Sequence, residues 1–521
     1  MTEDSIAGDV QLETLEAKGL IALATLRPEL EYLFRHALVQ DAAYGSLLKQ
    51  ERRELHGRVG DALEQLYPDR RGELALVLAM HFEQAGDADR AVDYLLDGAR
   101  HALAQNAIHE AFAAFDHATT LIAGQPEMPG QADGADLARR RRRRIEAGLG
   151  RAESGYSFRS QEEAFTELEA LVPEAEELGD AELTIRVHMA IALARLQIGE
   201  ASDSTLVKRS LDRIMTLADE IGDPALRGVP LIFVGLGQVF TGSVRRGVAS
   251  LEEGLPLLET RKDSIGAAFA RGGLAIGYAI LGEFDKAQVA ARQATELASQ
   301  GDLIAQLDAL IAESYVHSLR GDLDRAVPIA QQCVDRAEET GATACAVVSS
   351  WLLGDAFHRQ GRFAEAREVL KRGSDISLVV DRRVWRPTLQ AWLNTAGAAL
   401  GEVGPDGWDE ALATARSIGN RLGEAGILSK RGEAAAARGN LDAAVTDFSA
   451  SAQIFAEDGA RPYLARILRT WGEALLRAGR ADEARPILER SIATFEEIGL
   501  RSEAGAVRTV LAVGGAELKL A

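Results

Sequence analysis

Residues 272–301 read GGLAIGYAILGEFDKAQVAARQATELASQG, and this stretch decides the fold. Leu274 and Tyr278 lie one helical turn apart, and alanines at helical spacing follow Gly282. Glycine adopts without strain the left-handed backbone conformation in which a helix commonly ends. The stretch therefore predicts two antiparallel helices, with Gly282 between them and Gly301 at the end of the second.

Such glycines recur along the chain in two ladders. Successive members of the first ladder are 40, 39, 40, 40, 38 and 40 residues apart. The first ladder consists of Gly242, Gly282, Gly321, Gly361, Gly401, Gly439 and Gly479. The second ladder, half a period out of phase, consists of Gly179, Gly222, Gly301, Gly341, Gly419, Gly459 and Gly499. Two helix ends every forty residues indicate stacked helical hairpins, each burying its apolar side against the next.

Length and charge agree with such an array. The 521 residues exceed what one compact core usually holds, whereas a repeat array has no such limit. The net charge of −21 makes nucleic acid an unlikely partner, because phosphate binding requires a basic surface. The run Arg139–Arg144 is basic, but many glutamates follow it, so we expect a solvated or internally paired helix.

Neither a secretory signal nor a membrane span is expected. The N-terminus MTEDSIAGDV lacks the basic start and apolar run of a signal peptide. The most apolar windows, 229–241 and 265–281, are interrupted by Gly, Arg or Gln and are judged too short for a span. Cys333 and Cys345 are expected to be small buried residues in a reducing compartment. We therefore expect a cytoplasmic protein without a membrane partner.

The repeated pattern resembles the tetratricopeptide repeat, which has a small residue in its first helix, a Gly-Asp/Glu turn and an alanine early in its second helix. Units at 346–374, 424–459 and 464–499 show this pattern, and the resemblance covers about 136–513. It implies an all-α, tetratricopeptide-like α-solenoid, a right-handed superhelix of helical hairpins over 136–521. The forty-residue period exceeds the usual thirty-four, which lengthens each helix by about three residues.

Three other segments complete the predicted organisation. Gly86 and its neighbours mark a turn in a first group of helical repeats, 71–123, and GQPEMPGQADGA at 124–135 is a predicted linker. The turn-forming insert at 402–408 delays the second helix of its unit, so we predict an irregularity or bend there.

Residues 1–70 follow a different pattern. We predict a short helix ended by Gly19, a β-hairpin from 21–26 and 32–35, and helices through 36–44 and 52–66. The run YLFRHALVQDAAYGSLLKQERRELHGRVGDALE (32–64) resembles the tail of the winged-helix module in STAND-type signalling ATPases. In that family the module follows the nucleotide-binding domain and precedes a helical-repeat arm. Class III adenylate/guanylate cyclase-associated ATPases and large LuxR-type regulators are the nearest members.

The chain lacks the residues that nucleotide chemistry requires. Gly272–Gly277 has the glycine spacing of a phosphate loop, but Tyr278-Ala279 follows where lysine and a hydroxyl residue are needed. No H-E-x-x-H, no Cys/His cluster at ligand spacing and no G-x-S-x-G elbow occurs in the sequence. We therefore expect no enzyme activity, cofactor or metal. The resemblance implies a C-terminal sensor arm, with a nucleotide-binding domain encoded upstream as one partner.

Binding is the remaining function class. In tetratricopeptide arrays the first helices line a concave groove, and residues four apart share a face. All five tryptophans lie between 351 and 471, and Trp and Arg are enriched at the energetic centres of interfaces. The candidate groove residues are Tyr315, Trp351, Asp355, Arg359, Arg382, Arg383, Trp385, Arg386, Arg469 and Glu473. Alternatively, the tryptophans fill gaps left by the irregular repeat.

Two hypotheses for function remain. The chain is either the sensor arm of a STAND-type system, binding a protein, a peptide or a small inducer, or an independent tetratricopeptide scaffold for complex assembly. The two hypotheses differ at the N-terminus. A sensor arm should leave residues 1–70 unstable alone, whereas a scaffold should begin with a well-packed cap.

Overall fold

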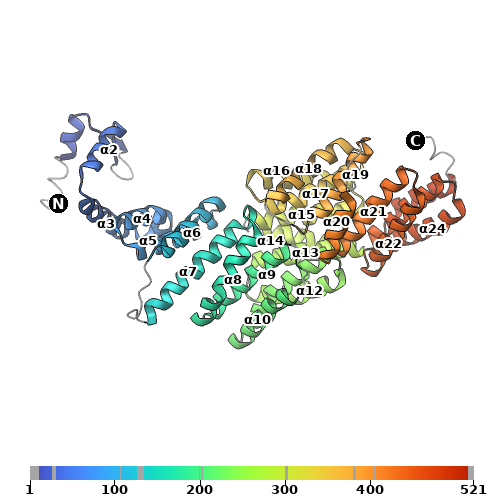
Figure 1. The fold of residues 1–521 in the computed structure, drawn as a ribbon, viewed down its shortest axis with the longest axis horizontal. Coiled ribbons are helices and arrows are strands. Elements are labelled where there is room, and N and C mark those ends of the chain that lie inside the picture. The colour runs from blue at the N-terminus through green and yellow to red at the C-terminus, as the bar shows by residue number, and fades with distance from the viewer. Residues whose placement is uncertain are drawn as a thin grey trace. The chain divides into compact units, whose positions relative to one another are not determined.

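The structure is a computed structural model, shown in Figure 1. It describes residues 11–25, 31–105, 107–125, 134–198, 200, 204–299, 303–379, 383–402 and 407–513. The chain forms two compact units. Unit 1 comprises Met1–Ala102 and Ala113–Gln131, and unit 2 comprises Leu103–Phe112 and Ala132–Ala521.

Unit 1 begins with a small α+β segment. A helix over residues 11–17 ends near Gly19, which has a φ of 72°. Strands β1 (Ile21–Thr25) and β2 (Glu31–Phe34) pair antiparallel, with Ile21 opposite Phe34. Helices α2 (Ala37–Ser46) and α3 (Lys49–Leu66) follow. The predicted short helix, hairpin and two helices are therefore confirmed.

This first segment has almost no core. None of the ten residues of α2 is buried, and Gly60 is the buried residue of α3. Leu38 is 81% exposed, Leu48 70% and Leu66 68%. A row of large apolar side chains therefore lies uncovered over the described part of residues 33–66.

The next helices of unit 1 form a packed hairpin. Helix α4 (Arg71–Ala85) reverses into α5 (Ala88–Ala104) at Gly86, whose φ is 83°. Phe82 and Tyr94 stack across this hairpin with ring centroids 5.5 Å apart. The 3-10 turn Pro68–Arg70 precedes the hairpin, and α6 (Ile108–Ala123) follows it. The predicted linker 124–135 lies largely outside the described residues.

Unit 2 is an array of antiparallel helices that follow one another in chain order (Figure 1). Its first helices are α7 (Gly134–Ser154), α8 (Gln161–Leu178), α9 (Ala181–Gln197) and α10 (Thr205–Ile221), with 3-10 turns at Gly155–Ser157 and Pro224–Arg227. The hairpins that follow are α11 (Gly228–Thr241) with α12 (Val244–Thr260), α13 (Ser264–Leu281) with α14 (Phe284–Ala298), α15 (Leu303–Arg320) with α16 (Leu323–Glu339), α17 (Thr343–Arg359) with α18 (Phe363–Val379), α19 (Arg386–Ala399) with α20 (Gly407–Ser417), α21 (Arg421–Ala437) with α22 (Leu441–Glu457), and α23 (Arg461–Arg477) with α24 (Ala481–Glu497), before α25 (Arg501–Val513).

The glycine ladders end these helices as predicted. Every ladder glycine within the described residues has a positive φ, from 67° at Gly419 to 120° at Gly242. The predicted small residues also lie where helices cross. A side chain at Gly432 would place its Cβ 2.7 Å from Phe448, and Gly354 and Gly472 approach Leu370 and Leu488 equally closely. The predicted all-α array is therefore confirmed.

The unit that contains the 402–408 insert is irregular. Helix α20 has 11 residues and α19 has 14, whereas the helices on both sides have 17. Residues 403–406 of the insert lie outside the described residues. The predicted delay of the second helix is confirmed, and the predicted bend remains untested.

Helix α13 is a long, strongly apolar helix of the core. Its 18 residues reach the length and hydropathy of a membrane span, which corrects the judgement that 265–281 falls short of one. The share of this helix that is buried inside the protein is 67%, and α11, α12, α14 and α15 pack against it. Its apolar composition is therefore explained by its central place in the array.

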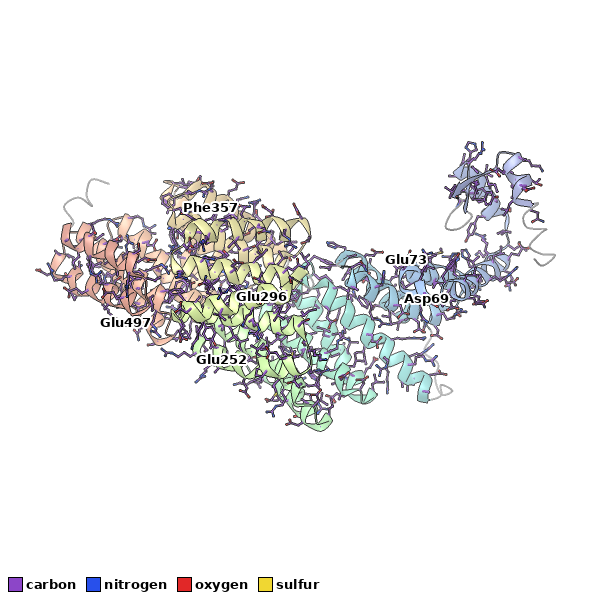
Figure 2. All side chains as sticks on the ribbon, turned by 180° about the vertical axis from the view of Figure 1, so that it is seen from behind. Asp69, Glu73, Glu252, Glu296, Phe357 and Glu497 are labelled. Carbon is purple, nitrogen blue, oxygen red and sulfur yellow. The ribbon has the colours of Figure 1, made fainter. Side chains whose placement is uncertain are left out.

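Several second helices carry exposed charged side chains. Figure 2 shows Glu252 of α12, Glu296 of α14 and Glu497 of α24, all of which are exposed. The basic run of α7 is internally paired, as expected: Arg141 contacts Glu177 at 2.5 Å and Arg144 contacts Glu174 at 2.8 Å.

Hairpins that are five apart in the array touch one another. Helix α11 contacts α21, and α13 contacts α23. The turn glycines after the early helices lie against the later hairpins: Gly242 and Gly321 against the beginnings of α21 and α25, and Gly282 against Ile498 at the end of α24 and, at 3.7 Å, Arg461 at the beginning of α23. Thus a Cβ at Gly242 would lie 2.8 Å from Arg421, one at Gly282 would lie 2.5 Å from Ile498, and Gly321 lies against Glu503. We call this line of contact, between the ends of α11, α13 and α15 and the beginnings of α21, α23 and α25, the seam.

Candidate ligand-binding cavity

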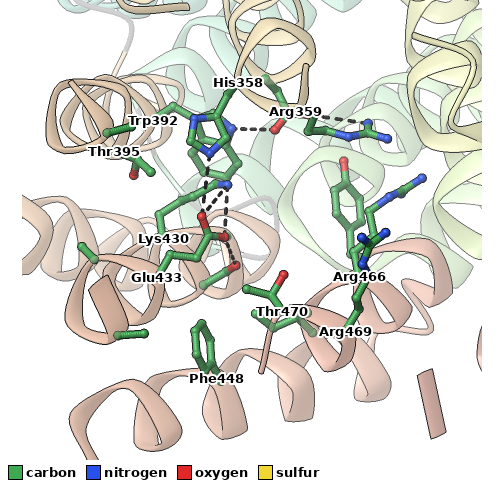
Figure 3. A pocket seen from close by; sticks show the side chains of 18 of the residues that line it. His358, Arg359, Trp392, Thr395, Lys430, Glu433, Phe448, Arg466, Arg469 and Thr470 are labelled. Carbon is green, nitrogen blue, oxygen red and sulfur yellow. Dashed lines mark hydrogen bonds and ion pairs between the residues drawn. The ribbon is translucent and has the colours of Figure 1, made fainter. Parts of the chain in front are cut away.

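A half-open cavity of about 1620 Å³ lies on the inner side of unit 2. Residues of the first helices α11, α15, α17, α19, α21, α23 and α25 line it, together with residues of the second helices α16, α18, α20, α22 and α24. First helices face inward because their small residues pack against the second helices, and their larger residues remain for the interior. Figure 3 shows part of this cavity from close by.

The cavity gathers most of the candidate groove residues. Seven of them line it: Tyr315, Trp351, Asp355, Arg359, Trp385, Arg469 and Glu473. Arg383 instead contacts Glu162 of α8 at 2.7 Å. Arg386 is the first residue of α19 and does not line the cavity. Arg382 lies outside the described residues. The residues predicted four apart on one face of α17 and of α23 therefore do share one face.

One wall of the cavity is aromatic. The Trp351 ring lies 5.9 Å from Tyr315, 5.9 Å from Trp385 and 6.0 Å from Trp392, and Phe240 stands 5.4 Å from Trp385. Trp351 as a whole is 7% exposed. Its Nε1 atom is buried and has no hydrogen-bond partner among the described residues. Trp392 and Trp408 thus belong to the irregular unit, Trp351 belongs to the unit before it, and all three line the cavity.

A polar cluster continues from this wall. The Trp392 Nε1 atom donates to Asp355 at 2.8 Å, and the Tyr315 and Tyr463 hydroxyls lie 2.7 Å apart. Burial raises the pKa of both tyrosines, so both hydroxyls remain protonated. The Tyr315–Tyr463 bond joins α15 to α23, which makes it part of the seam.

Two arginines bind the end of α15. Arg359 of α17 donates to the Ser318 carbonyl at 2.8 Å, and Arg466 of α23 donates to the Leu319 carbonyl at 2.6 Å. The last carbonyls of a helix lack intrahelical partners and carry the negative end of its dipole. The C-terminus of α15 therefore holds a cation from each side of the seam.

A second charged cluster lines the same cavity (Figure 3). Glu433 accepts hydrogen bonds from Lys430 at 3.2 and 3.3 Å, and His358 lies 3.8 Å away. Burial alone would raise the pKa of Glu433, but Lys430 and His358 outweigh it and lower this pKa to about 2. Glu433 therefore remains charged inside the cavity at neutral pH.

Several lining residues were missed by sequence analysis, among them Trp392, Lys430, Glu433, Tyr463 and Arg466. A signal for the last two was available. Tyr463, Arg466, Thr470, Glu473 and Arg477 follow one another at steps of three or four residues, so the predicted stripe on α23 could have been extended toward its N-terminus. Among the described residues, no group of three or more His, Cys, Asp or Glu is arranged to hold a metal ion.

Comparison with known proteins identifies the repeat. The tetratricopeptide repeat family matches residues 423–497, and a second tetratricopeptide repeat match covers residues 347–372. The array is a tetratricopeptide-like α-solenoid. A crystal structure of a Rap protein complexed with Competence and Sporulation Factor is similar over 70% of this chain and 99% of that chain, with 11% identity and a TM-score of 0.51.

Other similarities are more distant. The Cut9–Hcn1 hetero-tetramer of APC/C is similar over 91% of this chain and 89% of that chain, with 13% identity and a TM-score of 0.49. A STAND protein with a tetratricopeptide repeat sensor from Pyrococcus horikoshii is similar over 78% of this chain and 58% of that chain, with 14% identity and a TM-score of 0.42. An uncharacterized protein of Rhizobium meliloti (strain 1021) is 29% identical over 119 residues, which are 22% of this chain and 11% of that protein.

Proposed function

We propose that this chain is a non-catalytic sensor arm of a STAND-type signalling system and that it binds a protein segment or peptide in the cavity of the solenoid. The observation that supports this proposal most directly is the cavity itself, which combines an aromatic wall with charged side chains. Small-molecule sites usually have volumes of about 300–1,000 Å³. A cavity of about 1620 Å³ favours a peptide over a small inducer.

The uncovered segment at the start of unit 1 supports the idea of an arm. Leu33, Phe34, Leu38, Leu48 and Leu66 are all between 44% and 81% exposed. A row of exposed large apolar residues indicates a surface that another module covers. An independent scaffold, which remains the alternative, would instead begin with a packed cap. The proposed covering module is the nucleotide-binding domain that precedes this segment in STAND-type proteins.

Peptide binding can be tested by selection from a library of random heptapeptides. Wild-type chain should enrich a subset of sequences, and their binding should change the fluorescence of the cavity tryptophans. Trp351→Ala should weaken the selected peptides by about tenfold or more, because it removes the centre of the aromatic wall. Val289→Ala, an exposed change on α14, serves as the control. Equal binding by wild type and Trp351→Ala would place the peptides elsewhere.

The arm hypothesis has its own test. Limited proteolysis of the full chain should cut first within residues 33–66, and an added STAND-type nucleotide-binding protein from the same gene neighbourhood should protect that segment. ATP hydrolysis by the added protein should then respond to a selected peptide. Resistance of residues 33–66 in the isolated chain would instead support the scaffold.

A further inference from the structure

Arg359 and Arg466 come from opposite sides of the seam and meet inside the cavity. Arg359 belongs to α17, next to α15, whereas Arg466 belongs to α23, three hairpins further along the chain than α17. Both guanidinium groups point to the last turn of α15, where they donate to adjacent carbonyls. Figure 3 shows both arginines on this side of the cavity.

The charge of this arginine pair is poorly matched by the carboxylates around it. The nearest carboxylates of Arg359 and Arg466 are Asp355 and Glu503, each at 3.8 Å. By comparison, Arg469 contacts Glu473 at 2.6 Å in the same cavity. Burial, together with repulsion from Arg359, lowers the pKa of Arg466 to about 9. Among the described residues, the pair therefore lacks a carboxylate in close, bidentate contact.

An apolar surface lies beside the pair. Trp351 is two helical turns before Arg359 on α17, which corresponds to about 12 Å along the helix axis. Its ring lines the cavity, and its Nε1 atom is buried without a partner among the described residues. Asp355, between the two, already accepts a hydrogen bond from Trp392. The two guanidinium groups are donors without a close carboxylate, so a ligand should supply acceptors to them.

We propose that the cavity binds a ligand that carries a carboxylate beside an aromatic or large aliphatic group, and that this carboxylate lies between Arg359 and Arg466 and thereby fastens the seam. The inference rests on the proposed function, since it concerns the ligand of the same cavity. Arginine forms bidentate pairs with carboxylates, and one carboxylate can bridge two guanidinium groups. A ligand that touches both sides of the seam binds the closed turn better than an open one and so shifts the population toward closure.

Two matched pairs of probes test the chemistry. The first pair is the blocked peptides acetyl-Ala-Trp-Glu-Ala-amide and acetyl-Ala-Trp-Gln-Ala-amide, which differ only in the carboxylate. The second pair is indole-3-propionate and its amide, which tests a small aromatic acid as the source. Titration calorimetry with the full chain should show that, in one pair, the acid binds at least about tenfold more tightly than the amide. A tenfold difference in affinity is what one favourable charge-assisted hydrogen bond contributes. The pair that shows it identifies the source.

The variants locate the carboxylate. Arg466→Gln should abolish the preference for the acid, and Arg359→Gln should do the same from the near side of the seam. Arg477→Gln is the matched control, because Arg477 lines the cavity on the same helix but contacts Glu473. Bound acid should also slow hydrogen exchange on both sides of the seam, at 315–321 and 461–466. Circular dichroism verifies that each variant is folded.

Each outcome decides the inference. Equal affinity for acid and amide in both pairs, including no binding of either, would overturn it, and so would a preference that survives Arg466→Gln and Arg359→Gln in folded protein. Neither result would affect the proposed function, which the heptapeptide library tests independently. A preference for the acid without slower exchange across the seam would overturn the fastening role.

Discussion

At the scale of single residues, Glu433 shows how the cavity keeps a buried charge. Its carboxylate lies between Lys430 and His358, and their influence exceeds the penalty of burial. Since the folded-state pKa of about 2 is below the ordinary value of 4.5, the ionised group stabilises the fold. This stabilisation is fully present above pH 4.5 and disappears as the pH falls from 4.5 toward 2.

We therefore expect Glu433→Gln to destabilise the protein at pH 6 and to matter progressively less toward pH 2.5. The difference should be at most about 3 kcal/mol, since one pKa unit corresponds to about 1.4 kcal/mol. Urea denaturation of wild type and variant at pH 6, 4 and 2.5 measures it. Glu296→Gln, an exposed change on α14, is the control. A gap that stays constant over this range would contradict the assigned role of Glu433.

Cys333 occupies in α16 the position that serine occupies in later repeats. Its Sγ atom lies 3.6 Å from the Leu307 carbonyl, 26 residues earlier, and Ser451 and Ser491 donate at 2.7 Å to carbonyls 26 residues before them. Cys333→Ser should therefore change the free energy of unfolding by no more than about 1 kcal/mol. Cys333→Leu should lower it by about 1–3 kcal/mol through overpacking, because the site is fully buried. Thermal unfolding of both variants tests this.

The same cysteine should be chemically inert in the folded protein. Burial raises the pKa of the Cys333 thiol to about 12, and the thiolate is the reactive form. A thiol reagent at pH 8 should therefore modify Cys333 only after denaturation, which mass spectrometry of the labelled peptide can follow. Rapid labelling of the native chain would show that α16 opens locally.

At the scale of elements, the turn glycines divide into two kinds that look alike in the sequence. Gly282 and Gly439 have φ values of 81° and 79°, so alanine is strained equally at both. A Cβ at Gly282 would lie 2.5 Å from Ile498 across the seam, whereas nothing lies within 4 Å of one at Gly439. Gly439 thus serves only to end its helix, whereas Gly282 both ends its helix and packs closely against Ile498 across the seam.

We expect Gly439→Ala to cost about 1–2 kcal/mol, the price of a left-handed alanine. Gly282→Ala should cost at least about 1 kcal/mol more, because Ile498 is buried and must move. Chemical denaturation of the two variants in parallel measures the difference. Equal losses would show that the seam does not contribute to stability at this point.

This division marks the limit of what the sequence could predict. The ladder of glycines is a local signal, so the helices and their turns followed from spacing. Spacing also placed Trp351, Asp355 and Arg359 on one face of their helix, and the resemblance to tetratricopeptide arrays implied that this face points inward. The contact between Gly282 and Ile498 joins residues more than two hundred positions apart. It depends on how many hairpins complete one turn, which small rotations between neighbours determine. For this reason the sequence could place Arg466 on the stripe of α23 but could not show that it meets the end of α15.

At the scale of the whole array, the seam converts a chain of neighbours into a closed turn. In an open solenoid, a change in one repeat affects chiefly the adjacent repeats. Here α23 and α25 support the ends of α13 and α15 through Arg461, Arg466 and Glu503. Stability should therefore be shared between hairpins that are distant in the chain.

Removal of residues 460–521 tests this sharing. The truncation deletes α23, α24 and α25 and with them the partners of Gly282 and Gly321. Hydrogen exchange should become faster at 276–282 and 315–321, although more than a hundred residues separate these segments from the cut. Exchange at 366–374, in the middle of the array, serves as the internal reference. Faster exchange confined to α21 and α22 would show that the turn is open in solution.

The contact between hairpins that are five apart also restricts how the number of repeats in such a gene can change. An open array tolerates the gain or loss of a unit at any junction, since every junction is equivalent. Duplication of one forty-residue unit between α15 and α21 would shift each later helix by one place, so that Gly282 would face α21 and Arg466 would miss the end of α15. The number of units in this part of the chain is therefore fixed by geometry, and additional units can be accommodated only outside it.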